Sequence, residues 1–192
     1  MLKAGVLGAV HLGKIHLKLL QQSTKYTLVG FFDANQEDAK AIEKEHGYKS
    51  FPSMEALIAA CDMVDVVTPT IHHYQCAEKV ITAGKHLFIE KPITHTVAQA
   101  DSIRDLAKKH GVRGQVGQVE RFNPAFMAVN HMIDKPMFIE GHRLAEFNPR
   151  GTDVSVVLDL MIHDIDAILS VVKSDVKKVH ASGVSVISET PD

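Results

Sequence analysis

The sequence predicts an α/β fold in which a doubly wound parallel sheet is followed by an incomplete α+β domain. Through the first 120 residues, short apolar runs alternate with amphipathic stretches, which is the pattern of repeated strand–helix units around a parallel sheet. Gly47, Gly84 and Gly111 follow three of the amphipathic stretches, where a left-handed residue often ends a helix. After "RFNP" (Arg121–Pro124) the alternation changes. We therefore expect one domain over residues 1–120 and part of a second over residues 121–192.

The elements follow from the periodicity of the apolar residues. In the first domain the apolar runs predict strands over Ala4–Leu7, Thr27–Phe32, Val64–Thr68, His86–Glu90 and Gln115–Val119. The stretches between them predict helices over Leu12–Gln22, Gln36–His46, Met54–Ala60, His73–Ala83 and Val97–His110. The second domain is expected to contain a helix over Ala125–Met132, a strand over Phe138–Ala145, a long helix over Val156–Val172 and a strand over Lys178–Ile187.

The composition excludes several classes of protein. A formal net charge of -2 and a pI near 6.6 give no basic field for nucleic acid. No apolar run is long enough to span a membrane. Cys61 and Cys76 lack metal-type spacing, so we expect free thiols in a reducing compartment. Lys3 and the apolar residues after it resemble a signal peptide, but charged residues follow without a cleavage site, so a cytoplasmic chain is expected.

The stretch "GAVHLG" (Gly8–Gly13) joins the first strand to the first helix and nearly matches a dinucleotide-binding turn. Gly8 permits a tight turn, and Gly13 allows the helix to pack closely on the strand. Val10 stands where a glycine normally lets the backbone approach a pyrophosphate. If the turn required a positive φ there, Val10 would carry a backbone penalty as well as a steric one. The alternative is a tight strand–helix turn without a ligand.

Asp33 ends the second expected strand, 20 residues beyond Gly13. An acidic side chain at this place accepts hydrogen bonds from the ribose hydroxyls of a bound dinucleotide. Its charge repels a 2'-phosphate, so NAD is favoured over NADP. A helix N-cap or turn residue before the next helix is the alternative for Asp33.

Three further stretches carry polar residues at places where such a fold binds ligands. "TPTIHH" (Thr68–His73) and "EKP" (Glu90–Pro92) each follow a strand, and the crevice at the carboxyl ends of parallel strands is the usual ligand site. "DLMIHDID" lies in the long helix of the second domain, where Asp159, His163 and Asp166 share one face by their spacing.

With these motifs in this order, the sequence resembles the Gfo/Idh/MocA family of oxidoreductases over nearly its whole length, including "AGKHLFIEKP", "RFNPAF" and "DLMIHDID". The resemblance implies a Rossmann-type first domain and NAD(P)-dependent hydride transfer. The substrate would be a secondary alcohol of a sugar, cyclitol or nucleotide sugar. The stretch "NPRGTDVSVVLDLMIHDID" is further similar to members that act as UDP-N-acetylglucosamine 3-dehydrogenases. Family members have a complete second domain, so the chain is expected to be C-terminally truncated relative to them, and a full-length form to be a homo-oligomer.

The resemblance also implies roles for single residues. Its catalytic set is Lys91, Asp159 and His163, with His163 as the base and Lys91 bound to the reacting oxygen. The implied cofactor-binding residues are Gly8, Val10, His11, Leu12, Gly13, Asp33, Thr68, Pro69, His73, Glu90 and Lys91. The implied substrate-binding residues are Lys91, Arg121, Asn123, Asp159 and His163. His72 does not fit the family spacing and is expected at the surface, and Arg121 with Asn123 is equally well explained as a locally bonded hinge pair.

Two rival functions remain open. His163 and Asp159 have a spacing that also suits a metal-dependent hydrolase, although we assign no metal ligands because no convincing further ligand occurs. A non-catalytic, regulatory NAD-binding domain is favoured by Val10 and by the truncation. For the oxidoreductase and for the regulatory domain, the expected cofactor is NAD. The expected partner is a small molecule, and binding to nucleic acid or to a membrane is not expected.

Overall fold

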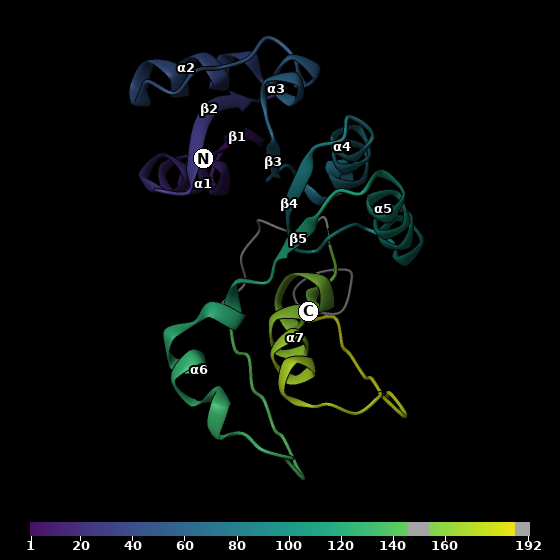
Figure 1. The fold of residues 1–192 in the computed structure, drawn as a ribbon. Coiled ribbons are helices and arrows are strands. Elements are labelled where there is room, and N and C mark those ends of the chain that lie inside the picture. The colour runs from purple at the N-terminus through teal and green to yellow at the C-terminus, as the bar shows by residue number, and fades with distance from the viewer. Residues whose placement is uncertain (146–153, 187–192) are drawn as a thin grey trace. The chain divides into compact units, whose positions relative to one another are not determined.

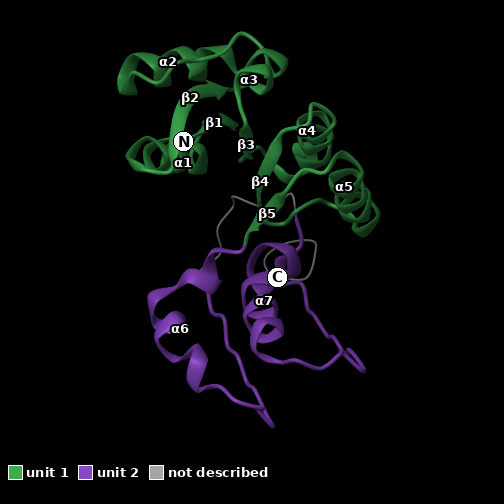
Figure 2. Cartoon of the chain, in the orientation of Figure 1, with its two compact units in different colours: residues 1–117 green, residues 118–192 purple. Residues whose placement is uncertain are grey.

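The computed structural model describes residues 1–145 and 154–186, which divide into two compact units. Unit 1 covers Met1–Gly117 and unit 2 covers Gln118–Asp192 (Figure 2). The sequence pattern placed the division after residue 120. Each unit is described by itself.

Unit 1 is built on one parallel sheet of five strands (Figure 1). They are β1 (Leu2–Leu7), β2 (Tyr26–Phe32), β3 (Met63–Val66), β4 (His86–Glu90) and β5 (Gly114–Gly117). The spatial order β2-β1-β3-β4-β5 reverses direction between β1 and β3, and all four neighbouring pairs are parallel. The expected α/β class with a doubly wound parallel sheet is confirmed. All carboxyl ends of the strands therefore meet at one edge of the sheet.

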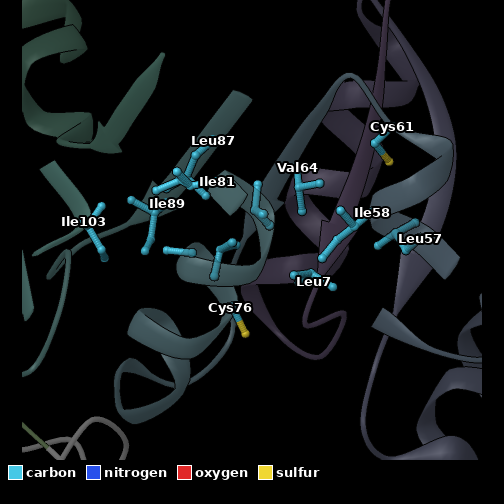
Figure 3. Close-up of a cluster of buried hydrophobic side chains, with 13 residues drawn as sticks. Leu7, Leu57, Ile58, Cys61, Val64, Cys76, Ile81, Leu87, Ile89 and Ile103 are labelled. Atoms are coloured by element: carbon cyan, nitrogen blue, oxygen red, sulfur yellow. The ribbon is translucent and has the colours of Figure 1, made fainter. Parts of the chain in front are cut away.

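Helices cover the sheet through two buried apolar clusters. The helices are α1 (Leu12–Gln22), α2 (Gln36–His46), α3 (Met54–Ala60), α4 (Thr70–Thr82) and α5 (Val97–His110). One cluster joins α1 and α2 to β1 and β2 through Val6, Leu17, Phe31 and Ile42. The larger cluster joins α3, α4 and α5 to β1, β3 and β4, with Ile81, Leu87 and Ile103 among its side chains (Figure 3). Because opposite sides of β1 enter different clusters, β1 is buried on both faces.

The helix ends show why these segments form the helices that the sequence predicts. Asn35 and Thr96 accept hydrogen bonds from the first amides of α2 and α5, respectively. Gly47 and Gly111 end the same helices with φ of 73° and 65°, a left-handed conformation that costs glycine little. Gly84 follows α4 closely and has a φ of 71°. The helix-ending role expected for these glycines is confirmed at Gly47 and Gly111.

Some boundaries differ from the expectation. Helix α4 begins at Thr70 rather than His73, because Pro69 stands directly before it and its carbonyl accepts a hydrogen bond from His72 N. The fifth strand ends at Gly117, and a 3-10 helix η1 (Val119–Phe122) follows in unit 2 where the sequence predicted continued strand. These shifts leave the order of elements in unit 1 unchanged.

Unit 2 contains helices but, among its described residues, no strand. After η1 come α6 (Pro124–Val129), η2 (Asn130–Met132), the π-helical turn η3 (Val157–Met161) and α7 (Ile162–Val171). The strands expected over Phe138–Ala145 and Lys178–Ile187 are therefore wrong for the residues described, and Ile187 lies outside them. Both segments have strand-like composition, but a strand requires a neighbour to pair its backbone, and within residues 118–145 and 154–186 neither segment is paired with one.

Across residues 1–145 and 154–186, no helix has the length and apolar character needed to cross a membrane.

A first prediction concerns the contact between α1 and β1. A Cβ added at Gly13 would lie 2.1 Å from the carbonyl oxygen of Gly8, so Gly13→Ala forces the helix away from the sheet. We expect unit 1 to lose about 1–3 kcal/mol of unfolding free energy, measured by chemical denaturation. Gly114→Ala is the matched control, because its added Cβ has its nearest neighbour at 4.0 Å. Equal stability of the two variants would contradict the prediction.

Candidate functional site

The carboxyl edge of the sheet in unit 1 gathers most of the residues expected to bind a cofactor. Gly8 follows β1, Asp33 follows β2, Thr68 lies just beyond β3, and Lys91 follows β4. Because β1 and β3 are neighbours and the sheet reverses its winding between them, Gly8 and Thr68 flank the point where open α/β sheets bind ligands.

The glycine turn is closely packed on two sides. Gly8 has a φ of 87°, and a Cβ there would lie 2.9 Å from both the backbone nitrogen of Thr68 and the carbonyl of Val67. Gly13 faces the carbonyl oxygen of Gly8 in the same way, from the first turn of α1. Any side chain at either position would therefore separate α1 or the loop after β3 from the end of β1.

Val10 does not occupy the strained position of this turn. The positive φ falls on its neighbour His11, at 50°, so the backbone penalty considered for Val10 does not apply. The Val10 side chain is 37% exposed and its carbonyl accepts a hydrogen bond from Gly13 N at 3.1 Å. Within the described chain, no side chain caps the start of α1 and no acidic residue lies in its first turn. Apart from Gly13 N, which bonds the Val10 carbonyl, the amides at the start of α1 therefore have no side-chain cap among the described residues that would compete with an anion.

Asp33 ties the end of β2 to the glycine turn. Its Oδ2 accepts a hydrogen bond from Ala9 N at 2.8 Å, and its Oδ1 accepts one from Asn35 N at 2.9 Å. Asn35, rather than Asp33, provides the N-cap of α2. Each carboxylate oxygen can accept more than one hydrogen bond, so these contacts leave acceptor capacity for hydroxyl groups.

His73 joins the loop after β3 to the turn after β4. Its Nε2 lies 2.8 Å from the carbonyl oxygen of Thr68, and its Nδ1 lies 2.9 Å from the carbonyl oxygen of Pro92. Both acceptors are carbonyls, so both bonds form together only when both ring nitrogens carry protons. With 1% of its surface exposed, His73 lies beneath the two loops, and a direct contact with a cofactor stays a prediction. His72 is exposed, as expected.

Glu90 and Lys91 form the turn after β4. Glu90 Oε2 accepts a hydrogen bond from the backbone nitrogen of Lys91 at 3.2 Å. Gly117, on the neighbouring strand β5, leaves room for the Glu90 carboxylate, because a Cβ there would lie 2.5 Å from Oε1. Glu90 thus supports the turn that presents Lys91.

The sequence reasoning missed a buried charged cluster beside this turn. His16 Nδ1 lies 2.8 Å from Asp65 Oδ2, and His16 Nε2 lies 3.4 Å from Glu90 Oε1. Burial alone lowers the pKa of His16, but the contacts with Asp65 and Glu90 outweigh it and raise the pKa from 6.5 to about 9. Burial raises the pKa of Asp65. One signal was present in the sequence: Asp65 is the charged residue within the otherwise apolar strand Met63–Val66.

In unit 2, Arg121 and Asn123, two of the residues expected to bind substrate, make contacts within the unit. Arg121 makes two hydrogen bonds to Asp166, of 2.6 and 2.7 Å. Asn123 accepts a hydrogen bond from Ala125 N at the start of α6 and donates one to Glu120. The Asn123 bonds are local, as the hinge-pair alternative expects, whereas the Arg121–Asp166 pair joins residues 45 positions apart, and both substrate contacts and a hinge role stay predictions.

Asp159 and His163 lie on consecutive elements of unit 2. Asp159 belongs to the π-helical turn η3 and His163 to the first turn of α7, so the single regular helix expected over Val156–Val172 is interrupted. A π-turn is wider than an α-turn, and the spacing that put both residues on one face does not carry over unchanged. Within residues 1–145 and 154–186, no three His, Cys, Asp or Glu side chains are grouped as metal ligands.

Comparison with known proteins places the chain among oxidoreductases. Residues 2–118 match the model of the Gfo/Idh/MocA oxidoreductase family, with an NAD-binding Rossmann fold. The whole chain is 35% identical to UDP-N-acetylglucosamine 3-dehydrogenase from Acidithiobacillus ferrooxidans, covering 61% of that protein. A solved structure of that enzyme superposes with a TM-score of 0.92, covering 63% of its chain. An inositol 2-dehydrogenase from Rhizobium meliloti is 31% identical over 173 residues, which are 84% of this chain and 52% of that protein. The chain thus spans less than two thirds of these relatives.

The geometry of His73 generates a second prediction. His73→Ala removes both bonds to the Thr68 and Pro92 carbonyls and leaves a cavity, so we expect a loss on the order of 2–4 kcal/mol in unfolding free energy. His72→Ala, at the exposed neighbouring position, should change stability by less than about 0.5 kcal/mol. Thermal melting of both variants makes the comparison, and a tolerated His73→Ala substitution would show that the bridge is dispensable.

Proposed function

Because this chain belongs to the Gfo/Idh/MocA family of oxidoreductases, we propose that it binds NAD and supports oxidation of a secondary alcohol in a sugar, cyclitol or nucleotide sugar. The observation that carries the proposal is the carboxyl edge of unit 1, where Gly8, Asp33 and Lys91 follow three strands of one parallel sheet. The family match covers the same unit.

The residues of the glycine turn fit a dinucleotide. Gly8 and Gly13 have no room for a Cβ, so the turn packs closely between β1, α1 and the loop after β3. His11 and Leu12 bring the uncapped first amides of α1 to this place, and amides at a helix N-terminus favour an anion such as pyrophosphate. Val10 narrows the approach without straining the backbone, which supports weakened rather than abolished binding.

Asp33 supports the choice of NAD over NADP. Its carboxylate stands at the end of β2, where ribose hydroxyls are bound in this type of fold. Two backbone amides, from Ala9 and Asn35, hold the carboxylate in place, and a phosphate at the ribose would face its negative charge. Thr68 and Pro69 of the loop after β3, with Glu90 and Lys91 after β4, are the residues we assign to the nicotinamide side.

The proposed chemistry divides the alcohol's hydrogen atoms between two acceptors. NAD⁺, when bound, supplies the acceptor for the hydride from the alcohol carbon. His163 takes the hydroxyl proton on an imidazole nitrogen, which an unperturbed histidine does readily near neutral pH. The Lys91 ammonium group donates a hydrogen bond to the reacting oxygen and stabilises its developing charge. Asp159 orients the substrate or His163.

The substrate class is proposed from the relatives. UDP-N-acetylglucosamine 3-dehydrogenase is 35% identical to this chain, whereas the inositol dehydrogenases, some of which also match over more than 90% of the chain, are 28 to 31% identical. We therefore propose a nucleotide sugar before a cyclitol. The stretch that resembles the nucleotide-sugar enzymes begins at residues 148–153, which lie outside the described residues, and continues into η3 and α7.

The cofactor assignment predicts that NAD⁺ binds at least tenfold more tightly than NADP⁺, a difference of about 1.4 kcal/mol, in calorimetric titration. Asp33→Asn should narrow that preference because the negative charge facing the ribose is removed. Asp105→Asn, an exposed carboxylate on α5, is the matched control and should leave the preference unchanged. Equal or tighter binding of NADP⁺ by the unaltered chain would reject the assignment.

The catalytic assignment predicts that Lys91→Ala and His163→Ala each lower kcat by on the order of 10²- to 10⁴-fold, while calorimetry finds NAD⁺ affinity largely intact. Lys109→Ala and His131→Ala, at exposed positions of the same two units, are the controls. Turnover is measured in a protein that contains the whole chain, with a nucleotide sugar or inositol as substrate. Near-normal turnover of either variant would remove that residue from the catalytic set, and NAD⁺ binding without any turnover would favour the regulatory alternative.

A further inference from the structure

His16 connects the helix that follows the glycine turn to the strand ends that carry the proposed site. It lies four residues after Leu12, where α1 begins, and its ring lies over the sheet with its centroid 6.0 Å from that of Phe88 on β4. Only 14% of the side chain is exposed. One short helix thus carries both the amides of the glycine turn and a buried imidazole over β3 and β4.

The two groups that His16 joins are carboxylates from different strands. Asp65 lies within β3 and is 4% exposed, and Glu90 is the last residue of β4. Asp65 Oδ1 has no hydrogen-bond partner within the described part of the chain. The other oxygen, Oδ2, has its contact with His16, so this contact is important for the buried carboxylate. Two partly desolvated carboxylates repel each other, and a positive charge between them offsets that repulsion.

Glu90 transmits this contact to Lys91. Its Oε1 faces His16, and its Oε2 accepts the hydrogen bond from Lys91 N. Gly117 on β5 leaves the space that this carboxylate occupies. The backbone of the turn is held separately by His73, which reaches the Pro92 carbonyl from α4. Lys91 N is thus held by Glu90 of β4, which contacts His16 of α1, and the Pro92 carbonyl is held by His73 of α4.

We propose that His16 is a positioning residue for Lys91: by bridging Asp65 and Glu90, it fixes the Glu90 carboxylate that in turn holds the backbone of Lys91. The inference rests on the proposed function for its effect on catalysis, but the coupling between His16 and Lys91 is a property of unit 1 alone. His16 also links α1, which follows the glycine turn, to the turn after β4 that carries Lys91.

The protonation of His16 gives this coupling a pH dependence. Asp65 on β3 and Glu90 on β4 face the ring. His16 and Asp65 also line a groove of about 630 Å³, whose other titratable or charged residues are Tyr26, His86 and Arg113. Since the folded pKa of about 9 lies above the unfolded value near 6.5, the stabilisation is fully present below pH 6.5. It is lost as the pH rises through about 9, when a neutral ring leaves the two carboxylates facing each other.

The first test uses the chain without any cofactor. NMR titration of the unaltered chain should give an imidazole pKa near 9 for His16, and the Lys91 amide resonance should shift with the same midpoint. In His16→Gln, which keeps a hydrogen-bonding side chain but no charge, that shift of the Lys91 amide should disappear. His46→Gln is the matched control, because His46 pairs with Glu45 at 3.5 Å on the exposed surface. If the Lys91 amide resonance does not shift as His16 titrates, the proposal is overturned. This measurement uses the unaltered chain, so it does not depend on the folding of a variant.

The second test measures turnover in a protein containing the whole chain. His16→Gln should lower kcat by on the order of tenfold with little change in the KM for NAD⁺, because Lys91 is misplaced while the glycine turn remains. The alkaline fall of kcat that accompanies deprotonation of His16 should be absent from the variant. An unchanged kcat and pH profile in His16→Gln would overturn the role in catalysis. If the unaltered protein has no dehydrogenase activity, the proposed function fails, and the NMR titration still decides the coupling.

Discussion

The close approach of α1 to the end of β1 is the constraint on which the site depends. A Cβ added at Gly13 would lie 2.1 Å from the carbonyl oxygen of Gly8. The helix can therefore start this close to the strand only because Gly13 has no side chain. Gly8 also faces the loop after β3, where an added Cβ would lie 2.9 Å from Thr68 N. Because Gly8 and Gly13 have no side chains, the first amides of α1, the end of β1 and Thr68 lie close together. A hydrophobic core alone would not set this spacing, because apolar contacts are non-directional.

Around that fixed point, each neighbouring strand end is held by one polar side chain. Asp33 ties β2 to the turn through Ala9 N, His73 ties the loop after β3 to Pro92, and His16 ties β3 to the end of β4. All three bridges are at least partly sheltered from water, where hydrogen bonds and ion pairs are stronger than at the surface and unpaired partners are costly. Each of these strand ends is therefore held by a polar contact in addition to the apolar clusters of the sheet.

The elements of unit 1 could be predicted because their signals are local. Apolar periodicity predicted every helix of unit 1, and Gly47 and Gly111 predicted the ends of two of them. The contact of His16 with Asp65 joins residues 49 positions apart, and the bridge from His73 to Pro92 spans 19, so neither was visible in the pattern of neighbouring residues. The strands expected in unit 2 failed for a related reason. Composition shows that a segment is suited to a sheet, but the segment becomes a strand only when a partner strand pairs with its backbone.

Val10 illustrates how a motif can differ in sequence while its geometry is kept. The pattern suggested that a β-branched residue would strain the turn if a positive φ fell on it, yet the positive φ of 50° lies at His11 and not at Val10. The turn therefore forms without a middle glycine, and its hydrogen bond from Gly13 N to the Val10 carbonyl is intact. What the missing glycine changes is the surface above the turn, where a partly exposed isopropyl group replaces open backbone. The side chain at this position thus affects how closely an anion approaches the amides, whereas Gly8 and Gly13 decide whether those amides are brought to the site at all.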